Sequence, residues 1–255
     1  MIKHYLKVAF RNLMKYKMQS FVSIIGLAVG FTCFALSALW IRYEMTYDNF
    51  HKGSDRIYMV RAHYANEPGT SNFTPYPLME YLQDKMPEIE AVTAFTPHHV
   101  KFRLEETEQE VGMIDADSVF MNFFDIQLLK GTVNFLKSDG QEVAITKEFA
   151  KRLFSKEEDA LGKEVEVGRR VCKIGAIVSG WSNHSNIPYN ILAPARHSPR
   201  WGSSNEQLFI RVRERTDIDA FRTKMSTIRI NDIEKESELS DLLITRMSAL
   251  RFSDK

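Results

Sequence analysis

The chain has 255 residues, and its 34 lysines and arginines nearly balance 33 aspartates and glutamates, giving a formal net charge of +1. This balance gives no electrostatic argument for nucleic-acid binding, so we expect no nucleic-acid partner. The two cysteines, Cys33 and Cys172, exclude a disulfide framework and a four-cysteine zinc site.

An uncharged apolar run from Phe21 to Ile41 is the strongest feature near the N-terminus. As an α-helix, a run of this length rises roughly 31 Å, enough to cross the hydrocarbon core of a bilayer. A cleavable signal peptide is the alternative, but the run exceeds the usual h-region and no Ala-x-Ala-like site follows it. We therefore predict an uncleaved transmembrane helix over residues 20–42.

The leader, residues 1–19, is basic and contains no acidic residue. Its charged side chains are Lys3, Lys7, Arg11, Lys15 and Lys17. This excess predicts a cytoplasmic N-terminus and an extracytoplasmic location for residues 43–255. Apolar residues recur in the leader at helical spacing, which predicts a basic amphipathic helix on the membrane lipid. Alternatively, the leader continues the transmembrane helix. Within the span, Gly26 and Gly30 form a Gly-x-x-x-Gly pair, a candidate packing face for another helix.

After the span, short strand-like and helix-like segments alternate without a repeat, which predicts an α+β fold. Predicted strands are Arg56–His63, Val92–Phe95, Val100–Leu104, Glu110–Asp115, Glu142–Ile145, Glu164–Val167, Val171–Val178, Gln207–Arg213 and Ile244–Phe252. Predicted helices are Tyr76–Met86, Ser118–Phe123, Thr146–Phe154 and Asp217–Ile228.

Four segments between these elements have turn or loop composition. Residues 97–99, Pro-His-His, separate two strands in this interpretation, and Gly168 is the turn of a hairpin. Residues 138–140, Ser-Asp-Gly, are a candidate subdomain boundary. Residues 180–205 are rich in serine, asparagine and proline and predict a long loop.

Three motifs that indicate enzymatic chemistry are absent from the sequence. It has no Gly-x-x-x-x-Gly-Lys-Ser/Thr phosphate loop, no Gly-x-Ser-x-Gly elbow and no His-Glu-x-x-His. We therefore predict that the chain is not an enzyme, and we assign no catalytic, cofactor-binding or metal-binding residue.

Asp48, His51 and Asp55 would share one face of a helix, so a metal site is conceivable there. We prefer a structural role, in which His51 and Asp55 tie the membrane helix to the first strand and Arg56 is a local ion-pair partner.

Two further groups of polar residues carry weak signals. His98 and His99 fall in the predicted turn, where histidines need no special role. Ser182, His184 and Ser185 include a nucleophile and a base, but the sequence shows no acid to orient them. A run of acids near the predicted hairpin tip indicates a solvated edge: Glu105, Glu106, Glu108 and Glu110.

The segment after the apolar run carries the motif Tyr47-Asp48-Asn49-Phe50-His51-x-x-x-Asp55-Arg56-Ile57-Tyr58-x-Val60. This motif resembles the opening of FtsX/MacB-type ABC transporter permeases, in particular the variety abundant in Bacteroidetes. Other matching blocks follow the family order as far as residue 190. They are Ile2-Lys3-x-Tyr5-Leu6-Lys7-x-Ala9-x-Arg11-Asn12-Leu13, Gly26-Leu27-Ala28-Val29-Gly30, Asp115-Ala116-Asp117-Ser118-Val119-Phe120 with Phe123-Phe124 and Gly131, Val143-Ala144-Ile145-Thr146 with Ala150, Leu153-Phe154 and Leu161-Gly162-Lys163, and Val171 to Val178 with Asn183-His184-Ser185.

The resemblance implies a bacterial inner-membrane permease with a two-lobed, mixed α+β, MacB-like periplasmic core domain over residues 43–255. It implies a cytoplasmic ABC ATPase as partner, a homodimer or heterodimer of permeases, and a periplasmic adaptor as a further candidate partner. Such permeases transmit ATP-driven movement to the periplasm for export or mechanotransmission. The family pattern continues with three more membrane helices, so we expect this chain to be its N-terminal portion. A single-pass anchored binding or sensor module without an ATPase is the alternative, and no motif identifies a cargo.

Overall fold

The computed structural model describes residues 2–64, 68–181, 184–228 and 239–253. The chain divides into two compact units, one up to Thr46 and one from Tyr47 onward, which are described separately.

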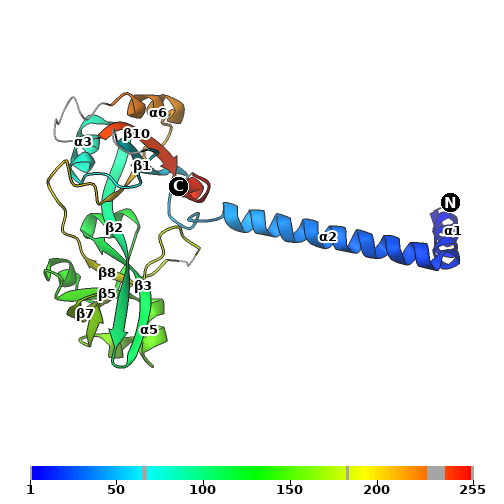
Figure 1. The fold of residues 1–255 in the computed structure, drawn as a ribbon, viewed down its shortest axis with the longest axis horizontal. Coiled ribbons are helices and arrows are strands. Elements are labelled where there is room, and N and C mark those ends of the chain that lie inside the picture. Colours follow the sequence, from blue (N-terminus) through cyan, green and yellow to red (C-terminus); the bar gives the residue numbers. More distant parts are fainter. Residues whose placement is uncertain (1, 65–67, 182–183, 229–238, 254–255) are drawn as a thin grey trace. The chain divides into compact units, whose positions relative to one another are not determined.

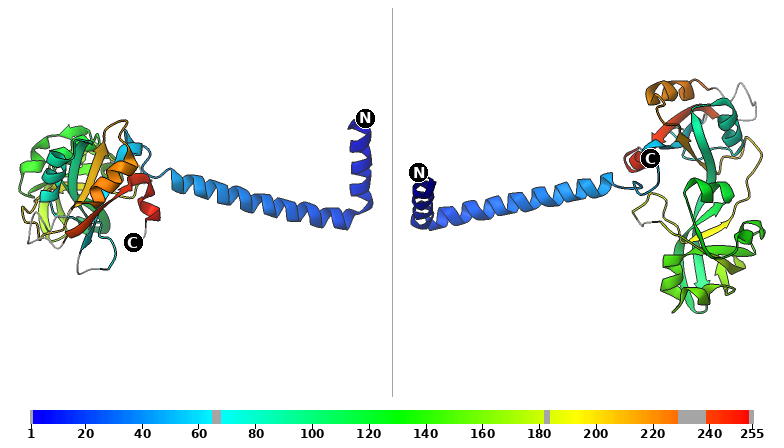
Figure 2. Two further views of the ribbon diagram at one scale, coloured as in Figure 1. Left: turned by 90° about the horizontal axis from the view of Figure 1, so that it is seen from above. Right: turned by 180° about the vertical axis from the view of Figure 1, so that it is seen from behind.

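The first unit consists of two helices, α1 (Ile2–Lys15) and α2 (Lys17–Met45). Tyr16 lies between them with φ −111° and ψ 56°, outside the helical region, and the chain turns there (Figure 2). The leader is therefore a separate helix and does not simply continue the span. Its position on a lipid surface stays a prediction.

Helix α2 is 29 residues long, and its most apolar window has a mean hydropathy of 2.2. It has the length and composition of a membrane span and begins a few residues before the predicted start at residue 20. A Cβ added at Gly26 or Gly30 would meet no atom within 4 Å, so both lie on an open face of this helix. A partner helix on that face stays a prediction.

The second unit is built on one mixed sheet with the strand order β10-β1-β9-β2-β3-β8-β5-β7-β4, and β6 pairs with β2 and β7 (Figure 1). The strands are β1 (Ile57–Tyr64), β2 (Ile89–Leu104), β3 (Thr107–Ala116), β4 (Leu128–Gly131), β5 (Glu142–Thr146), β6 (Glu164–Val167), β7 (Arg170–Val178), β8 (Ile191–Pro194), β9 (Gln207–Val212) and β10 (Leu239–Arg246). The α-helices are α3 (Pro77–Lys85), α4 (Ser118–Phe123), α5 (Lys147–Leu153) and α6 (Ile218–Ser226). Four 3-10 helices complete the described elements: η1 (Ser54–Arg56), η2 (Val133–Lys137), η3 (Glu157–Ala160) and η5 (Met247–Phe252). This is the mixed α+β fold that the sequence predicts.

Strand β2 connects the two ends of this sheet, as Figure 1 shows. Its first part, as far as Phe95, pairs with β9, and its second part, from Thr96, pairs with β3. The predicted turn at residues 97–99 is therefore wrong. Pro97 lies directly after the change of partner, opposite Ile114, where an extended backbone accommodates proline.

Three clusters of buried side chains form the core. The first packs α3 and α6 against β1, β9 and β10, and the third packs α5 against β5, β7 and the end of β2. The second cluster lies between these regions of the sheet and is rich in aromatic rings. Its buried phenylalanines are Phe95, Phe120, Phe123, Phe124, Phe135 and Phe209.

Local signals predict several elements correctly. The predicted helices Ser118–Phe123 and Thr146–Phe154 correspond to α4 and α5. In the structure Asp117 caps α4 by accepting from the Phe120 N–H, and Thr146 caps α5 by accepting from the Phe149 N–H. Gly168, at φ +64°, lies in the turn of the β6–β7 hairpin.

Three of the expectations for loops and ends are wrong. The loop over residues 180–205 contains β8, which is short and lies between β3 and β5. The last strand, β10, ends at Arg246, and η5 follows it where a strand was expected. The turn at residues 138–140 is no boundary, because Phe135 before it and Ala144 after it share one core cluster.

Candidate functional site

The residues directly after helix α2 form a buried, hydrogen-bonded knot centred on Asp48. Its side chain is 0% exposed and its φ of +57° is left-handed, a conformation that aspartate tolerates. Its Oδ1 accepts from Ser185 Oγ at 2.5 Å, and its Oδ2 accepts from Asn186 N at 3.1 Å and Asn186 Nδ2 at 2.6 Å. The Asp48 N–H donates to the His184 carbonyl at 3.2 Å. The segment that enters the domain is therefore tied to a loop about 137 residues later in the chain.

Burial and hydrogen bonding act on this carboxylate in opposite directions. Burial raises the pKa of Asp48 above its usual value, and the hydrogen bonds from Ser185 and Asn186 oppose that rise. The pKa of Asp48 is raised overall. Burial therefore destabilises the charged form more than the hydrogen bonds from Ser185 and Asn186 stabilise it.

Aromatic rings extend the knot. The Tyr47 and His184 ring centroids are 3.8 Å apart, and the His51 ring lies 4.8 Å from Trp181 and 5.0 Å from Phe124. Burial, with a smaller contribution from the Arg211 charge, lowers the pKa of His51 to about 4. The imidazole is therefore neutral near pH 7 and acts as a packed ring.

The described C-terminal segment joins the same knot. Asn186 Nδ2 donates to the Met247 carbonyl at 3.4 Å, and the Arg251 guanidinium carbon lies 4.1 Å from the Tyr47 ring centroid. Residues 47–51, 184–187 and 247–251 therefore meet in one place. We call this arrangement the junction.

The junction differs from both chemical hypotheses for these residues. Among the described residues, no group of three His, Cys, Asp or Glu side chains is placed to hold a metal ion. Asp55 is exposed and takes no part in the knot, whereas Asp48 and His51 are buried. Ser185 donates directly to Asp48 with no imidazole between them, so Ser185, His184 and Asp48 are not arranged as a serine–histidine–acid relay. Ser182 lies outside the described residues.

The other candidate residues have local partners. Arg56 pairs with Glu90 of β2 at 2.6 Å, and the carboxylate of its neighbour Asp55 also acts on its charge, so its principal partner lies outside the local segment. His98 lies in β2 and its Nε2 is 2.9 Å from Asp115 Oδ2. Glu108 of the acidic tip accepts from Lys101 and Arg103.

Sequence reasoning missed a second, partly buried charge cluster, centred on His197. Its ring stacks on Tyr76 with centroids 4.0 Å apart, and its Nδ1 lies 3.3 Å from Glu206 Oε1. Its Nε2 is 3.6 Å from Asp117 Oδ2. Burial lowers the pKa of His197, but the carboxylates of Asp117 and Glu206 outweigh it and raise the pKa to about 9. No motif predicts this cluster, because its members are far apart in the chain.

Comparisons with known proteins agree on one family of domains. The model of the MacB-like periplasmic core domain matches residues 20–228. A comparison with curated proteins found no match.

Three solved structures share the fold at low sequence identity. A domain of a permease protein from Porphyromonas gingivalis is 19% identical, with a TM-score of 0.62, and the match covers 77% of this chain and 92% of that one. The extracellular domain of the ABC-type transporter YknZ from Gram-positive bacteria is 14% identical, with a TM-score of 0.54 and coverages of 74% and 99%. The periplasmic region of MacB from Actinobacillus actinomycetemcomitans is 12% identical, with a TM-score of 0.54 and coverages of 78% and 92%. At these identities the likeness shows the fold alone.

Proposed function

Because the chain belongs to the MacB-like periplasmic core domain family, we propose that it acts as the N-terminal part of an ABC transporter permease. In this proposal, α2 is its first membrane helix, α1 lies on the cytoplasmic side of the inner membrane, and the second unit works in the periplasm. The match over residues 20–228 supports the family, and the basic leader supports the orientation.

The observation that carries the proposed role is the junction. Asp48 follows the last residue of α2, Met45, by three positions, and three hydrogen bonds fasten it to Ser185 and Asn186. Through Asn186 the same knot reaches Met247. A buried, multiply bonded attachment of this kind passes a displacement of the helix end into the domain, whereas a flexible linker would absorb it.

The proposed role assigns the chemistry to a partner. A cytoplasmic ABC ATPase hydrolyses ATP, and the permease carries the resulting movement to the periplasm for export or mechanotransmission. Pairing with a second permease subunit, and contact with a periplasmic adaptor, belong to the same proposal. The chain itself contributes no catalytic residue and needs no cofactor.

The orientation is tested by cysteine labelling. In a chain whose Cys33 and Cys172 are replaced by alanine, Lys52→Cys and Lys15→Cys each supply one exposed thiol. A membrane-impermeant maleimide added to intact spheroplasts should label Lys52→Cys, and Lys15→Cys only after lysis. Labelling of Lys15→Cys in intact spheroplasts would overturn the orientation.

The partner is tested by copurification. The protein from its complete gene, extracted in a mild detergent, should retain an ABC ATPase encoded beside it. The ATPase activity of that complex should fall when Asp48→Ala loosens the junction. A protein that is stable in the membrane and retains no ATPase would instead favour the anchored binding or sensor module.

A further inference from the structure

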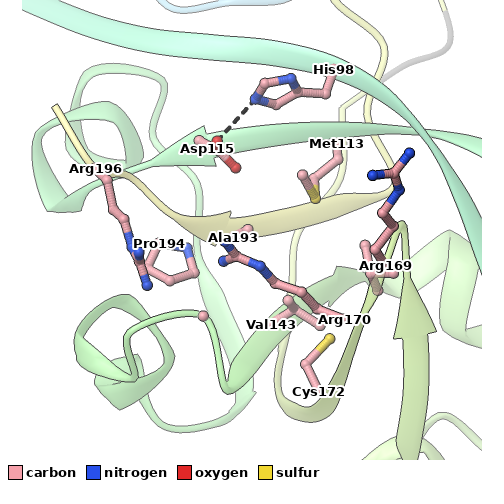
Figure 3. Close-up of a pocket in the computed structure, with 12 residues that line it drawn as sticks. His98, Met113, Asp115, Val143, Arg169, Arg170, Cys172, Ala193, Pro194 and Arg196 are labelled. Atoms are coloured by element: carbon pink, nitrogen blue, oxygen red, sulfur yellow. Dashed lines mark hydrogen bonds and ion pairs between the residues drawn. The ribbon is translucent and has the colours of Figure 1, made fainter. Parts of the chain in front are cut away.

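A pocket of about 330 Å³ lies among strands of the second unit and contains none of the junction residues (Figure 3). Strands β3, β8, β5 and β7 supply its walls, together with the turn of the β6–β7 hairpin. A volume of this order suits a small molecule or the head of a larger one.

The inner wall of the pocket is apolar. Met113 comes from β3, Val143 from β5, Cys172 from β7, and Ala193 and Pro194 from β8. Cys172 is 4% exposed, and burial raises the pKa of its thiol to about 11, so the sulfur is a neutral, apolar part of this wall.

The rim of the pocket is cationic. Arg169 and Arg170 come from the β6–β7 hairpin, Arg196 follows β8, and His98 comes from β2. In Figure 3 the side chain of Arg170 lies across the pocket, between Arg169 at one end and Arg196 at the other.

The acids of this region already have partners. Asp115 Oδ2 is 2.9 Å from His98 Nε2, and Asp139 Oδ1 is 2.5 Å from Arg196. Arg169 and Arg170 form no ion pair within the part of the chain that the structure describes. Two adjacent guanidinium groups therefore face the pocket without an ion-pair partner, although the charge of Arg170 also acts on the Asp115 carboxylate, which lines the same pocket.

We propose that this pocket binds a phosphate monoester that carries a short apolar group. A phosphate monoester is close to a dianion at neutral pH, which suits the adjacent positive charges of Arg169 and Arg170, neither of which has an ion-pair partner among the described residues. The planar guanidinium fork binds phosphate oxygens through paired N–H donors, and the apolar wall takes the group attached to the ester. A soluble phosphate ester and a phosphate-bearing lipid head share this chemistry.

This site is independent of the proposed coupling to an ATPase, because none of its residues belongs to the junction. Loss of ligand binding would leave the permease assignment intact, and failure to copurify an ATPase would leave the pocket intact.

Isothermal titration of the full chain in neutral detergent micelles tests the proposal. The probes are monohexyl phosphate, inorganic phosphate and hexyltrimethylammonium, the last with a matching chain and the opposite charge. Monohexyl phosphate should bind about tenfold more tightly than inorganic phosphate, because burying two methylene groups suffices for that factor. Hexyltrimethylammonium should not bind.

Two substitutions locate the site. Arg170→Gln should weaken binding of monohexyl phosphate about tenfold, since it removes a charged hydrogen-bonding partner. Arg222→Gln, on the exposed surface of α6, removes the same charge elsewhere and should leave the affinity unchanged. Circular dichroism and the thermal midpoint should show that both variants fold, because both side chains are exposed.

Three results would overturn the proposal: no binding of either phosphate probe, equal effects of the two substitutions, or equal affinity for monohexyl phosphate and inorganic phosphate. A competition arm identifies the source of the ligand. Displacement of monohexyl phosphate by dihexanoyl phosphatidic acid would identify a lipid head, and binding without displacement would identify a soluble ester.

Discussion

Replacement of Asp48 by alanine or by asparagine separates the geometry of the junction from its charge. Alanine leaves the donors of Ser185 and Asn186 without their acceptor, whereas asparagine keeps an acceptor of the same shape. Asparagine also adopts the left-handed backbone that Asp48 has at φ +57°.

The magnitude for Asp48→Ala follows from these contacts. Each buried donor left unpaired costs about 1–3 kcal/mol, and alanine at a left-handed φ adds about 1 kcal/mol. The raised pKa of Asp48 shows that burying its charge is unfavourable. Removing that charge therefore offsets part of the lost stability. We expect a net loss of about 3 kcal/mol in the free energy of unfolding.

The free energy of unfolding of Asp48→Asn should lie within about 1 kcal/mol of that of the original chain near pH 7. Its Oδ1 can accept from Asn186, and its amide can donate to Ser185 Oγ, which accepts as well as donates. The pH dependence has a definite sign. Because the folded pKa of Asp48 is raised, the stability of the original chain relative to Asp48→Asn decreases as the pH rises through that pKa.

Urea titration of the full chain in detergent micelles measures these differences. Trp181, in ring contact with His51 and Phe124, supplies a fluorescence signal inside the domain. A loss of about 3 kcal/mol should lower the midpoint by about 1–2 M urea. A midpoint for Asp48→Ala equal to that of the original chain would refute a stabilising knot. An equal loss of stability for Asp48→Ala and Asp48→Asn would refute the argument that the cost of burying the Asp48 charge offsets what that charge contributes.

Three further predictions concern stability, measured in the same urea assay. The folded pKa of His51 is lowered to about 4, so stability should fall as the pH drops from 6.5 toward 4, by at most about 3 kcal/mol, and His51→Phe should abolish this slope. The folded pKa of His197 is raised to about 9, so its contribution to stability is fully present below pH 6.5 and is lost as the pH rises through 9. If His197→Gln keeps the same decrease of stability at alkaline pH, this reasoning is contradicted. A Cβ at Gly131, where φ is +82°, would meet the Gly175 carbonyl oxygen at 2.2 Å, so Gly131→Ala should cost about 3 kcal/mol or more. Gly162→Ala, at φ +77° in open space, is its matched control and should cost only about 1 kcal/mol; similar costs for the two would show that contact with the carbonyl is unimportant.

The amino-acid sequence by itself determined the features that depend on neighbouring residues. The apolar run over residues 21–41 predicts a helix long enough to span a membrane, because its length and lack of charge are local properties. The predicted helices Ser118–Phe123 and Thr146–Phe154 and the turn at Gly168 are also correct, since the caps and the φ angle that define them depend on residues only a few positions apart.

Only the tertiary structure decided how distant segments meet. Pro97 signals a turn by its local chemistry, yet pairing with β3 keeps it in one extended strand. The hydrogen bond from Ser185 to Asp48 spans 137 positions, and the pocket brings Asp115 of β3 and the apolar residues of β8 close to the arginines of the β6–β7 hairpin. Such contacts arise from sheet order and core packing, which short-range patterns do not encode.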